Sequence, residues 1–241
     1  MSDSVLSGPV LLNNVDHHDL RVITDFGAEW GDAVNQTTVF APEFEALSRE
    51  YPIVFRRDAA GAFRAVALLG FEADENLYLD GQKWEARAIP ALMTRGPFSI
   101  GLPSAGGPGE AMIHITPDHP RISRERGQRI FLDHGGNTPY LDYAAGMLRS
   151  IYAGTQIGPA MIEAFDEAGL LEPVTLRMEA PDGRCFVVPD VWTLSQERFA
   201  ALDGAALARL NAGDFLRCAV WLMSSLDNLS ALLDRKLARG S

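Results

Sequence analysis

The sequence predicts an α+β fold in which a mixed or antiparallel sheet, built from hairpins, is accompanied by a helical C-terminal portion. Two apolar runs within residues 51–70 flank a turn-like segment at 58–61, an arrangement typical of a β-hairpin. Two further runs within residues 174–188 flank Pro181-Asp182-Gly183, which favours a tight turn. Because strands and helices alternate irregularly, α+β is favoured over a doubly wound sheet.

The longest helical pattern extends from residue 141 to residue 168, where apolar side chains recur at helical spacing. Gly154, Gly158 and Pro159 interrupt this pattern. They predict a division into two helices, because glycine and proline are both unfavourable inside a helix. Gly169 is expected to end the second helix, since glycine readily adopts the left-handed conformation found just past a helix end.

The C-terminal portion is predicted to be helical throughout. Thr193 and Gln196 have the spacing of a capping box, which predicts a short helix. Asp214 is expected to cap a longer helix whose apolar residues recur at alternating spacings of four and three. This seam has the 3.5-residue period of coiled-coil packing, and its length favours packing on the body of the protein, with a homodimer seam as the alternative. Its members are Phe215, Ala219, Leu222, Leu226, Leu229 and Leu233.

Shorter elements are predicted before these helices. Residues 1–40 form an irregular or lightly structured lead-in, because polar residues interrupt any apolar period. A short helix opens at Pro42, whose missing N–H has no helical partner in a first turn. Residues 76–79 are expected to form a third strand after the first hairpin, and residues 111–115 another strand.

Composition indicates a globular protein that can bury a large core. The chain has 241 residues, of which 47% are hydrophobic and 22% charged, as is ordinary for a folded domain. We expect a single domain over residues 1–241, with the Gly/Pro-rich loop 101–109 as the candidate internal boundary. The formal net charge of −11 repels phosphate backbones and anionic lipids, so no nucleic-acid partner is expected.

Targeting signals are not recognisable in the sequence. Residues 1–10 lack a basic region and a sustained apolar run, so no secretory signal is predicted. No apolar stretch approaches the length of about 18 residues that a membrane helix needs. We therefore expect a soluble, cytoplasmic protein without membrane insertion. Cys185 and Cys218 are in no CxxC motif, and both are predicted to be buried, reduced thiols.

A histidine-rich region is the one constellation that suggests metal chemistry. His114, Asp118, His119, Asp133 and His134 lie close together in the sequence, and two or three His with a carboxylate form an ordinary site for zinc or non-haem iron. However, the region has no HExxH motif, and chance clustering in a polar loop explains these residues equally well. Fe or Zn is therefore the alternative to a protein without a cofactor.

Other catalytic and nucleotide-binding motifs are missing. The 101–109 loop has neither the GxxxxGK[ST] nor the GxGxxG pattern, and no serine lies in GxSxG. Four arginines lie at 121, 124, 126 and 129; they could bind a carboxylate or a phosphate, but a solvated face is the favoured interpretation. Trp84, expected to be partly exposed, is the best aromatic candidate for a recognition surface, although core packing is favoured.

Several segments in order along the chain resemble the SapC family of bacterial proteins. The more specific ones are Tyr-Pro-Ile-Val-Phe at 51–55 and Leu-Leu-Gly-Phe at 68–71. The resemblance covers nearly the whole chain. It also includes Glu75–Leu79, Trp84, Ile89–Ala91, Arg95, Pro97, Phe98, Gly127, Phe131, Asp133, Thr138, Pro139 and Gly169–Pro173.

The resemblance implies an association with bacterial surface layers and their transport, or with outer-membrane nutrient receptors, and it supplies no catalytic residues. We therefore expect a non-enzymatic binding or accessory protein with a protein or peptide partner. Tyr51, Trp84, Arg95 and Phe98 are the candidate ligand-binding residues. The alternative is a metal-dependent enzyme, an oxygenase or hydrolase, that uses His114, His119 and His134.

Overall fold

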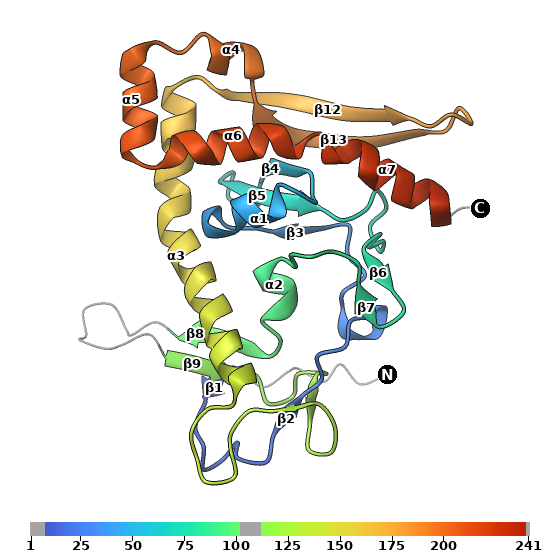
Figure 1. The fold of residues 1–241 in the computed structure, drawn as a ribbon, viewed down its shortest axis with the longest axis vertical. Helices are drawn as coiled ribbons and strands as arrows, with labels where there is room; N and C mark the ends of the chain where they lie inside the picture. The colour runs from blue at the N-terminus through green and yellow to red at the C-terminus, as the bar shows by residue number, and fades with distance from the viewer. Residues whose placement is uncertain (1–7, 102–111, 240–241) are drawn as a thin grey trace.

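A five-stranded antiparallel sheet forms the centre of the computed structural model, which describes residues 8–101 and 112–239 (Figure 1). The strands in spatial order are β12 (Leu171–Glu179), β13 (Cys185–Leu194), β4 (Ile53–Arg57), β5 (Phe63–Leu68) and β3 (Gln36–Thr38). The α+β class and both predicted hairpins, β4–β5 and β12–β13, are confirmed.

The turn chemistry of both hairpins explains their positions. The Asp58 carboxylate accepts the N–H groups of Ala60 and Ala62 at 3.0 and 2.9 Å, which closes the β4–β5 turn. Gly183 has φ of 84° in the β12–β13 turn, a conformation that glycine adopts without steric cost. Both signals are local in sequence, so the sequence predicted both hairpins.

The lead-in before residue 40 is more ordered than expected. β3 pairs with β5, with Thr37 opposite Ala67, and thereby forms an edge of the main sheet. β1 (Val10–Leu11) and β2 (Arg21–Val22) join smaller sheets, and a 3-10 helix covers Ala28–Trp30. Such short pairings depend on distant strands, and they leave little periodicity in their own sequence.

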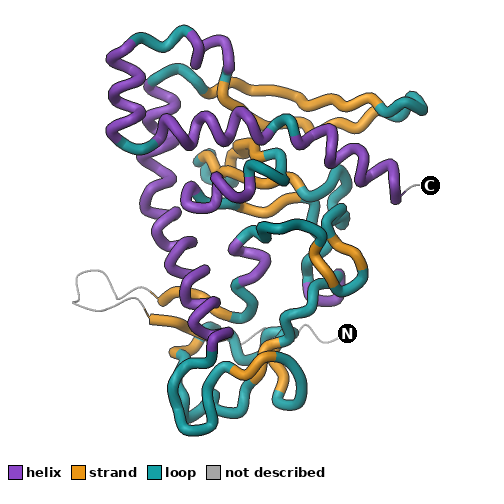
Figure 2. Tube along the Cα trace, in the orientation of Figure 1, coloured by secondary structure: helices purple, strands orange, loops and turns teal. Residues whose placement is uncertain are grey.

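Two of the three smaller sheets lie at the end of the molecule away from the five-stranded sheet, where loops and short strands dominate (Figure 2). The third, around residues 79–84, lies between the two ends (Figure 1). The predicted strand 111–115 is β9, and the predicted strand 76–79 is corrected, because pairing there begins only at Leu79. The sheets are β1-β9-β8, β10-β2-β11 and β6-β7. Their remaining strands are β6 (Leu79–Asp80), β7 (Lys83–Trp84), β8 (Phe98–Gly101), β9 (Met112–Ile115), β10 (Ile122–Ser123) and β11 (Gln128–Arg129).

The helix α3 (Pro139–Glu167) connects the two ends of the molecule as one continuous element (Figure 1). The expected division at Gly154, Gly158 and Pro159 is therefore wrong. Proline has no N–H to donate to the carbonyl of residue 155. Because Pro159 is exposed, water can donate to that carbonyl instead. Gly154 is buried against Phe40, so its small size is a packing requirement and not a helix break.

Tertiary packing along both halves keeps α3 continuous. Leu141 and Leu148 belong to one buried cluster, whereas Met161 and Phe165 belong to the main core. The C-terminal end matches the prediction. Gly169 has φ of 64°, and the N–H of Leu170 donates to the carbonyl of Phe165 at 2.9 Å, as in a Schellman motif.

The C-terminal portion is helical, as predicted, but in shorter pieces. The expected single helix is divided at residues 226–227. Ser225 accepts the N–H of Ile53 in β4, and Asn228 donates to the carbonyl of Ser48 at the end of α1 (Phe44–Leu47). Asp214 occupies the N-cap position of α6, as predicted, but its side chain makes no capping hydrogen bond. The N-cap of α4 is Ser195 and not Thr193, so the predicted capping box is wrong. The helices are α4 (Gln196–Ala200), α5 (Gly204–Ala212), α6 (Phe215–Ser225) and α7 (Asn228–Arg239).

The predicted apolar seam packs on the body of the protein. Ala219 and Leu222 are buried in the main core, and Leu229 packs against it. The seam is therefore covered within the chain, and a homodimer through it stays a prediction. Cys218 is buried as expected, whereas Cys185 is exposed at the start of β13, which corrects its prediction.

The predicted short helix at Pro42 is present as a 3-10 turn, Ala41–Glu43, followed by α1 (Phe44–Leu47). Except for Gly101, the Gly/Pro-rich loop 101–109 lies outside the described residues, and the single-domain organisation stays a prediction. Among residues 8–101 and 112–239, no helix has the length and apolarity that a membrane span requires.

Candidate functional site

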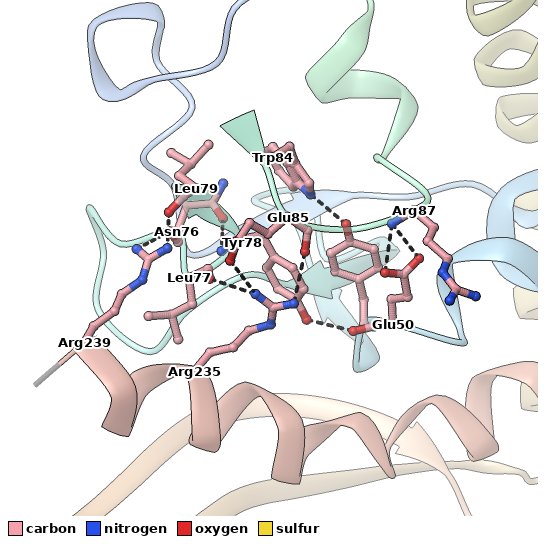
Figure 3. A network of polar contacts seen from close by, with 11 residues as sticks. Glu50, Asn76, Leu77, Tyr78, Leu79, Trp84, Glu85, Arg87, Arg235 and Arg239 are labelled. Carbon is pink, nitrogen blue, oxygen red and sulfur yellow. Dashed lines mark hydrogen bonds and ion pairs between the residues drawn. The ribbon is translucent and has the colours of Figure 1, made fainter. Parts of the chain in front are cut away.

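Tyr51 and Trp84, two of the four predicted ligand-binding residues, lie in the main core. The Trp84 Nε1 donates to the Tyr51 hydroxyl at 2.7 Å, and that hydroxyl donates to the carbonyl of Ala88 at 2.7 Å. The Tyr78 ring is tilted against that of Tyr51, with 4.5 Å between centroids. It is stacked with that of Trp84, with 6.3 Å between centroids (Figure 3). Trp84 is only 8% exposed, so its predicted partial exposure is wrong, and the geometry assigns both residues a packing role.

Phe98 and Arg95 lie in a different region. Phe98 is fully buried in the smaller cluster, and its carbonyl accepts a hydrogen bond of 2.8 Å from the Arg95 guanidinium. The four predicted residues therefore do not surround one pocket. Of the four, Arg95 lines a cavity, which it shares with none of the other three.

The candidate metal ligands are not brought together. Among the described residues, no group of three or more His, Cys, Asp or Glu could hold a metal ion. His114 lies on β9 opposite Ser99, whereas Asp133 pairs with Arg129 in an exposed loop beside His134. The Nδ1 of His119 accepts the N–H of Arg121 at 3.1 Å. His114, Asp118, His119, Asp133 and His134 thus gain no geometric support as a metal centre.

The short helix α2 (Ala91–Thr94) has a cavity on each side, and two carboxylates hold the segment that leads into it. Glu50 accepts the N–H groups of Arg87 and Ala88 at 2.9 to 3.0 Å. Glu43 accepts the N–H of Ala91 at 2.7 Å and that of Phe40 at 3.0 Å. These bonds link α2 to the α1 region, so the wall between the cavities is fixed by the core.

Glu43 achieves this from a partly buried position. Burial raises the pKa of its carboxyl above the ordinary value, and the hydrogen bonds from Ala91 and Phe40 oppose that shift. Both carboxylate oxygens are occupied by backbone donors. Glu43 lines neither of the two cavities beside α2, so it is a positioning residue for this helix.

The cavity that we call the Arg121 cavity lies on one side of α2 and has a volume of about 320 Å³. This volume is in the range of small-molecule sites. Its walls combine apolar side chains with a few polar groups from five different segments. It is lined by Ile23, Thr24, Phe26, Ile89, Met93, Thr94, Gly96, Arg121, Gln128, Tyr140 and Tyr143.

Arg121 is the charged residue of this cavity, and its charge is neutralised inside the protein. Its Nη2 donates to Asp32 at 2.6 Å, and both side chains are about 5% exposed. Its Nη1 donates to the carbonyls of Ile23, at 3.2 Å, and Asp25. Asp32 in turn accepts the N–H of Gly27 at 2.9 Å. The ion pair therefore fixes the 23–32 segment as one wall of the cavity.

Tyr140 supplies the polar group with the clearest freedom to bind. Its hydroxyl makes no hydrogen bond to another described residue, and it lines the cavity near Gly96. Burial raises the pKa of this hydroxyl, with Arg121 opposing the shift. Tyr140 therefore stays protonated at neutral pH and can both donate and accept a hydrogen bond.

His119 stays uncharged next to this site. Burial is the first cause that lowers the pKa of its imidazole, and the positive charges of Arg121 and Arg95 lower it further, while Asp32 opposes them. Since Nδ1 accepts the N–H of Arg121, the proton of the neutral ring lies on Nε2. No described histidine ring hydrogen-bonds to a Ser, Thr or Cys side chain.

In the arginine run of 121–129, Arg124, Arg126 and Arg129 are exposed, as expected of a solvated face, whereas Arg121 is buried. Arg124 pairs with Asp19 and Arg129 with Asp133. Arg126 lies over the ring of Trp30, with 5.8 Å to the centroid. Because Asp32 lies 89 positions before Arg121, no local signal in the sequence identifies this pair.

A larger groove of about 580 Å³ lies between α3 and the β4–β5 hairpin. Its charged residues Arg57, Arg64, Glu163 and Asp166 are all exposed. Solvated charges of both signs are ordinary on a protein surface. The Arg121 cavity, with its buried ion pair and converging hydroxyls, is therefore the stronger candidate.

The chain is an α+β protein whose strongest candidate site is the Arg121 cavity. Residues 12–232 of the chain match the family model named SapC. The chain belongs to the SapC family, as its sequence segments indicated. No curated protein and no solved structure matches it.

Proposed function

We propose that this SapC protein is a non-enzymatic binding protein that holds a small, uncharged and partly apolar molecule in the Arg121 cavity. The observation that carries the proposal is the neutral lining of that cavity. Arg121, its charged member, is already paired with Asp32 at 2.6 Å. A charged ligand would therefore lack a counterion, whereas a neutral polar group can bond to Tyr140, Thr24 or Gln128.

The size and rigidity of the cavity support the same proposal. At about 30 Å³ per water-sized group, a volume of about 320 Å³ accommodates roughly ten to twelve non-hydrogen atoms. Glu43 and Asp32 fix the two walls before any ligand arrives. A preformed site loses less conformational entropy on binding.

We propose further that binding serves an accessory role at the bacterial envelope, in surface-layer transport or in uptake linked to outer-membrane receptors. Membership of the SapC family supports this role. A protein or peptide partner is part of the proposal, because an accessory protein acts only if another component recognises whether its ligand is bound. The acidic surface, with a formal charge of −11, favours a partner that is not a polyanion.

The binding proposal is tested with a library of uncharged small molecules of about ten to twelve non-hydrogen atoms, screened by thermal shift. Compounds that raise Tm are then titrated calorimetrically into wild-type protein, Tyr140→Phe and Tyr152→Phe. Loss of the Tyr140 hydrogen bond is worth roughly 1 kcal/mol, so Kd should rise about fivefold in Tyr140→Phe.

Tyr152→Phe is the matched control, since Tyr152 lies on the same helix but does not line the Arg121 cavity. It should bind like wild type. Failure of every uncharged compound to bind, or equal Kd values for the two variants, would contradict the site.

The accessory role is tested by deleting the gene in the native cell and quantifying surface-layer proteins and outer-membrane receptors by mass spectrometry. We expect one of these classes to fall, and to recover with wild-type protein but not with Tyr140→Phe. Unchanged envelope proteins would contradict the envelope role without affecting the binding result.

A further inference from the structure

A second cavity lies on the other side of α2, and a partly buried arginine lines it. We call it the Arg95 cavity. Its volume is about 240 Å³, and it shares no lining residue with the Arg121 cavity. It is lined by Leu92 and Arg95 from the α2 segment, Ser99 and Ile100 from β8, and Leu148, Ile151, Tyr152 and Thr155 from α3.

Arg95 differs from Arg121 because no described carboxylate neutralises it. It makes none of the ion pairs in the described part of the chain. Among the described residues, its side chain makes one hydrogen bond, in which Nη1 donates to the carbonyl of Phe98 at 2.8 Å. Burial lowers the pKa of the Arg95 guanidinium, and no nearby charge offsets this effect. The remaining N–H groups of the fork are left for a ligand.

The other walls of the cavity are mainly aliphatic. Ile100, Leu148 and Ile151 pack with the smaller hydrophobic cluster and present a surface of hydrocarbon groups. Tyr152 and Thr155 are exposed on α3, so the cavity opens to solvent along that helix. The Thr155 hydroxyl already donates to the carbonyl of Tyr152 at 2.7 Å, which leaves Ser99 as a neutral polar neighbour of Arg95.

We propose that the Arg95 cavity binds a small carboxylate with a short aliphatic body. The carboxylate would accept hydrogen bonds from the free face of the Arg95 guanidinium, and the aliphatic body would lie along Ile100, Leu148 and Ile151. Charge complementarity selects this occupant, because a partly buried cation without a counterion loses part of its solvation and an anion compensates that loss. A volume of about 240 Å³ limits the buried body to roughly eight non-hydrogen atoms.

This site is independent of the proposed function. The Arg121 cavity takes an uncharged molecule, and the Arg95 cavity takes an anion. Because the two cavities have different lining residues, either proposal can fail while the other stands.

The test uses octanoate as the probe, titrated calorimetrically into the full-length protein at pH 7. Octanol has the same body without the charge, and acetate has the charge without the body. We expect octanoate to bind at least about tenfold more tightly than either, since both the ion pair and the aliphatic contact are needed. Equal binding of octanoate and octanol would overturn the proposal, because the cavity would then be only an apolar groove.

Arg95→Met removes the charge and keeps an unbranched side chain of similar length. We expect it to weaken octanoate binding at least about tenfold and to leave octanol binding unchanged. Arg149→Met, on the exposed surface of α3, is the matched control and should bind octanoate like wild type. If Arg95→Met does not fold, the comparison of octanoate, octanol and acetate on wild type decides the proposal alone.

A peptide with an apolar C-terminal residue provides the last arm, compared with its C-terminal amide. If the peptide binds, its amide does not and octanoate does not, then the cavity recognises a chain end, and the small-carboxylate proposal is wrong. If octanoate binds and the peptide does not, the proposal is supported.

Discussion

Of the ion pairs between described residues, Arg121–Asp32 is the one in which both side chains are almost fully buried. Such a pair is weak evidence for stability by itself, because removing two charges from water costs several kcal/mol and offsets their attraction. Its contribution here is geometric. One guanidinium bonds to Asp32 and to two backbone carbonyls, and so it gives the 23–32 segment one defined path beside the cavity.

Asp32→Asn should destabilise the protein strongly, because it leaves the Arg121 charge buried without a counterion. The expected loss in the free energy of unfolding is about 3 kcal/mol, measured by urea denaturation. Glu45→Gln is the control, since Glu45 pairs with Arg49 on the exposed surface of the chain. It should change stability by less than about 1 kcal/mol. Similar losses for the two variants would show that burial of the pair has no special importance.

The raised pKa of Glu43 should make the stability contribution of this residue decrease as the pH rises. Burial raises the pKa of this carboxyl above 4.5 in the folded protein, so the folded state holds the proton at pH values where the unfolded chain has lost it. The contribution of Glu43 is therefore fully present below pH 4.5 and is lost as the pH rises through the folded pKa.

Glu43→Gln removes this titration. The stability of wild type relative to Glu43→Gln should consequently fall as the pH is raised from about 4 to 7, as measured by urea denaturation at each pH. Glu45→Gln corrects for the loss of one surface charge. If the stability of wild type relative to Glu43→Gln instead rises as the pH is raised, the raised pKa is contradicted.

At the scale of the element, α3 shows how two identical residues in one helix have different roles. A Cβ on Gly154 would overlap Phe40, whereas a Cβ on Gly158 would meet no atom within 4 Å. Gly154→Ala should therefore lower the free energy of unfolding by about 1–2 kcal/mol, because of overpacking.

Gly158→Ala should raise the free energy of unfolding by about 0.5–1 kcal/mol, because alanine favours the helix. Thermal or urea unfolding of the two variants side by side measures both effects. Equal effects of the two substitutions would mean that Gly154 does not pack as the structure shows.

The elements that could be predicted from the sequence are those whose causes are local. Asp58 and Gly183 specify their turns within a few residues, so both hairpins could be predicted from the sequence. The break between α6 and α7 could not be predicted, because the Ser225 hydroxyl accepts the N–H of Ile53, 172 positions away, at 3.0 Å. The continuity of α3 past Pro159 likewise depends on packing at both of its ends.

The same reasoning explains the mixed outcome for the site. Arg95 was identified through a family segment, and it lines a cavity. Tyr51 and Trp84 came from the same kind of segment, but they bond to each other inside the core. A family-like aromatic segment therefore indicates core packing as readily as ligand binding. Arg121 and Tyr140 line the Arg121 cavity but come from separate parts of the chain, so no single segment of the sequence indicates this cavity.

At the scale of the whole molecule, α7 connects the C-terminal portion to the segment that carries Trp84. Arg235 bonds to the carbonyl of Glu85 at 3.0 Å and lies over the Tyr78 ring, 4.5 Å from its centroid. Arg239 bonds to the carbonyl of Asn76 at 3.0 Å and to that of Leu79. Figure 3 shows both side chains reaching from the helix toward this segment. The 76–85 segment in turn leads into the residues that Glu50 holds before α2.

Replacement of both arginines by glutamine should therefore loosen one distant segment and not the whole protein. Each lost charge-assisted bond is worth roughly 1.5 kcal/mol, so the amides of residues 76–85 should exchange with deuterium about tenfold faster or more. Arg209→Gln on the exposed side of α5 is the control and should leave exchange unchanged. Hydrogen–deuterium exchange with peptide-level mass spectrometry measures this. Faster exchange throughout the five-stranded sheet would instead indicate global destabilisation, and unchanged exchange at 76–85 would show that α7 does not hold this segment.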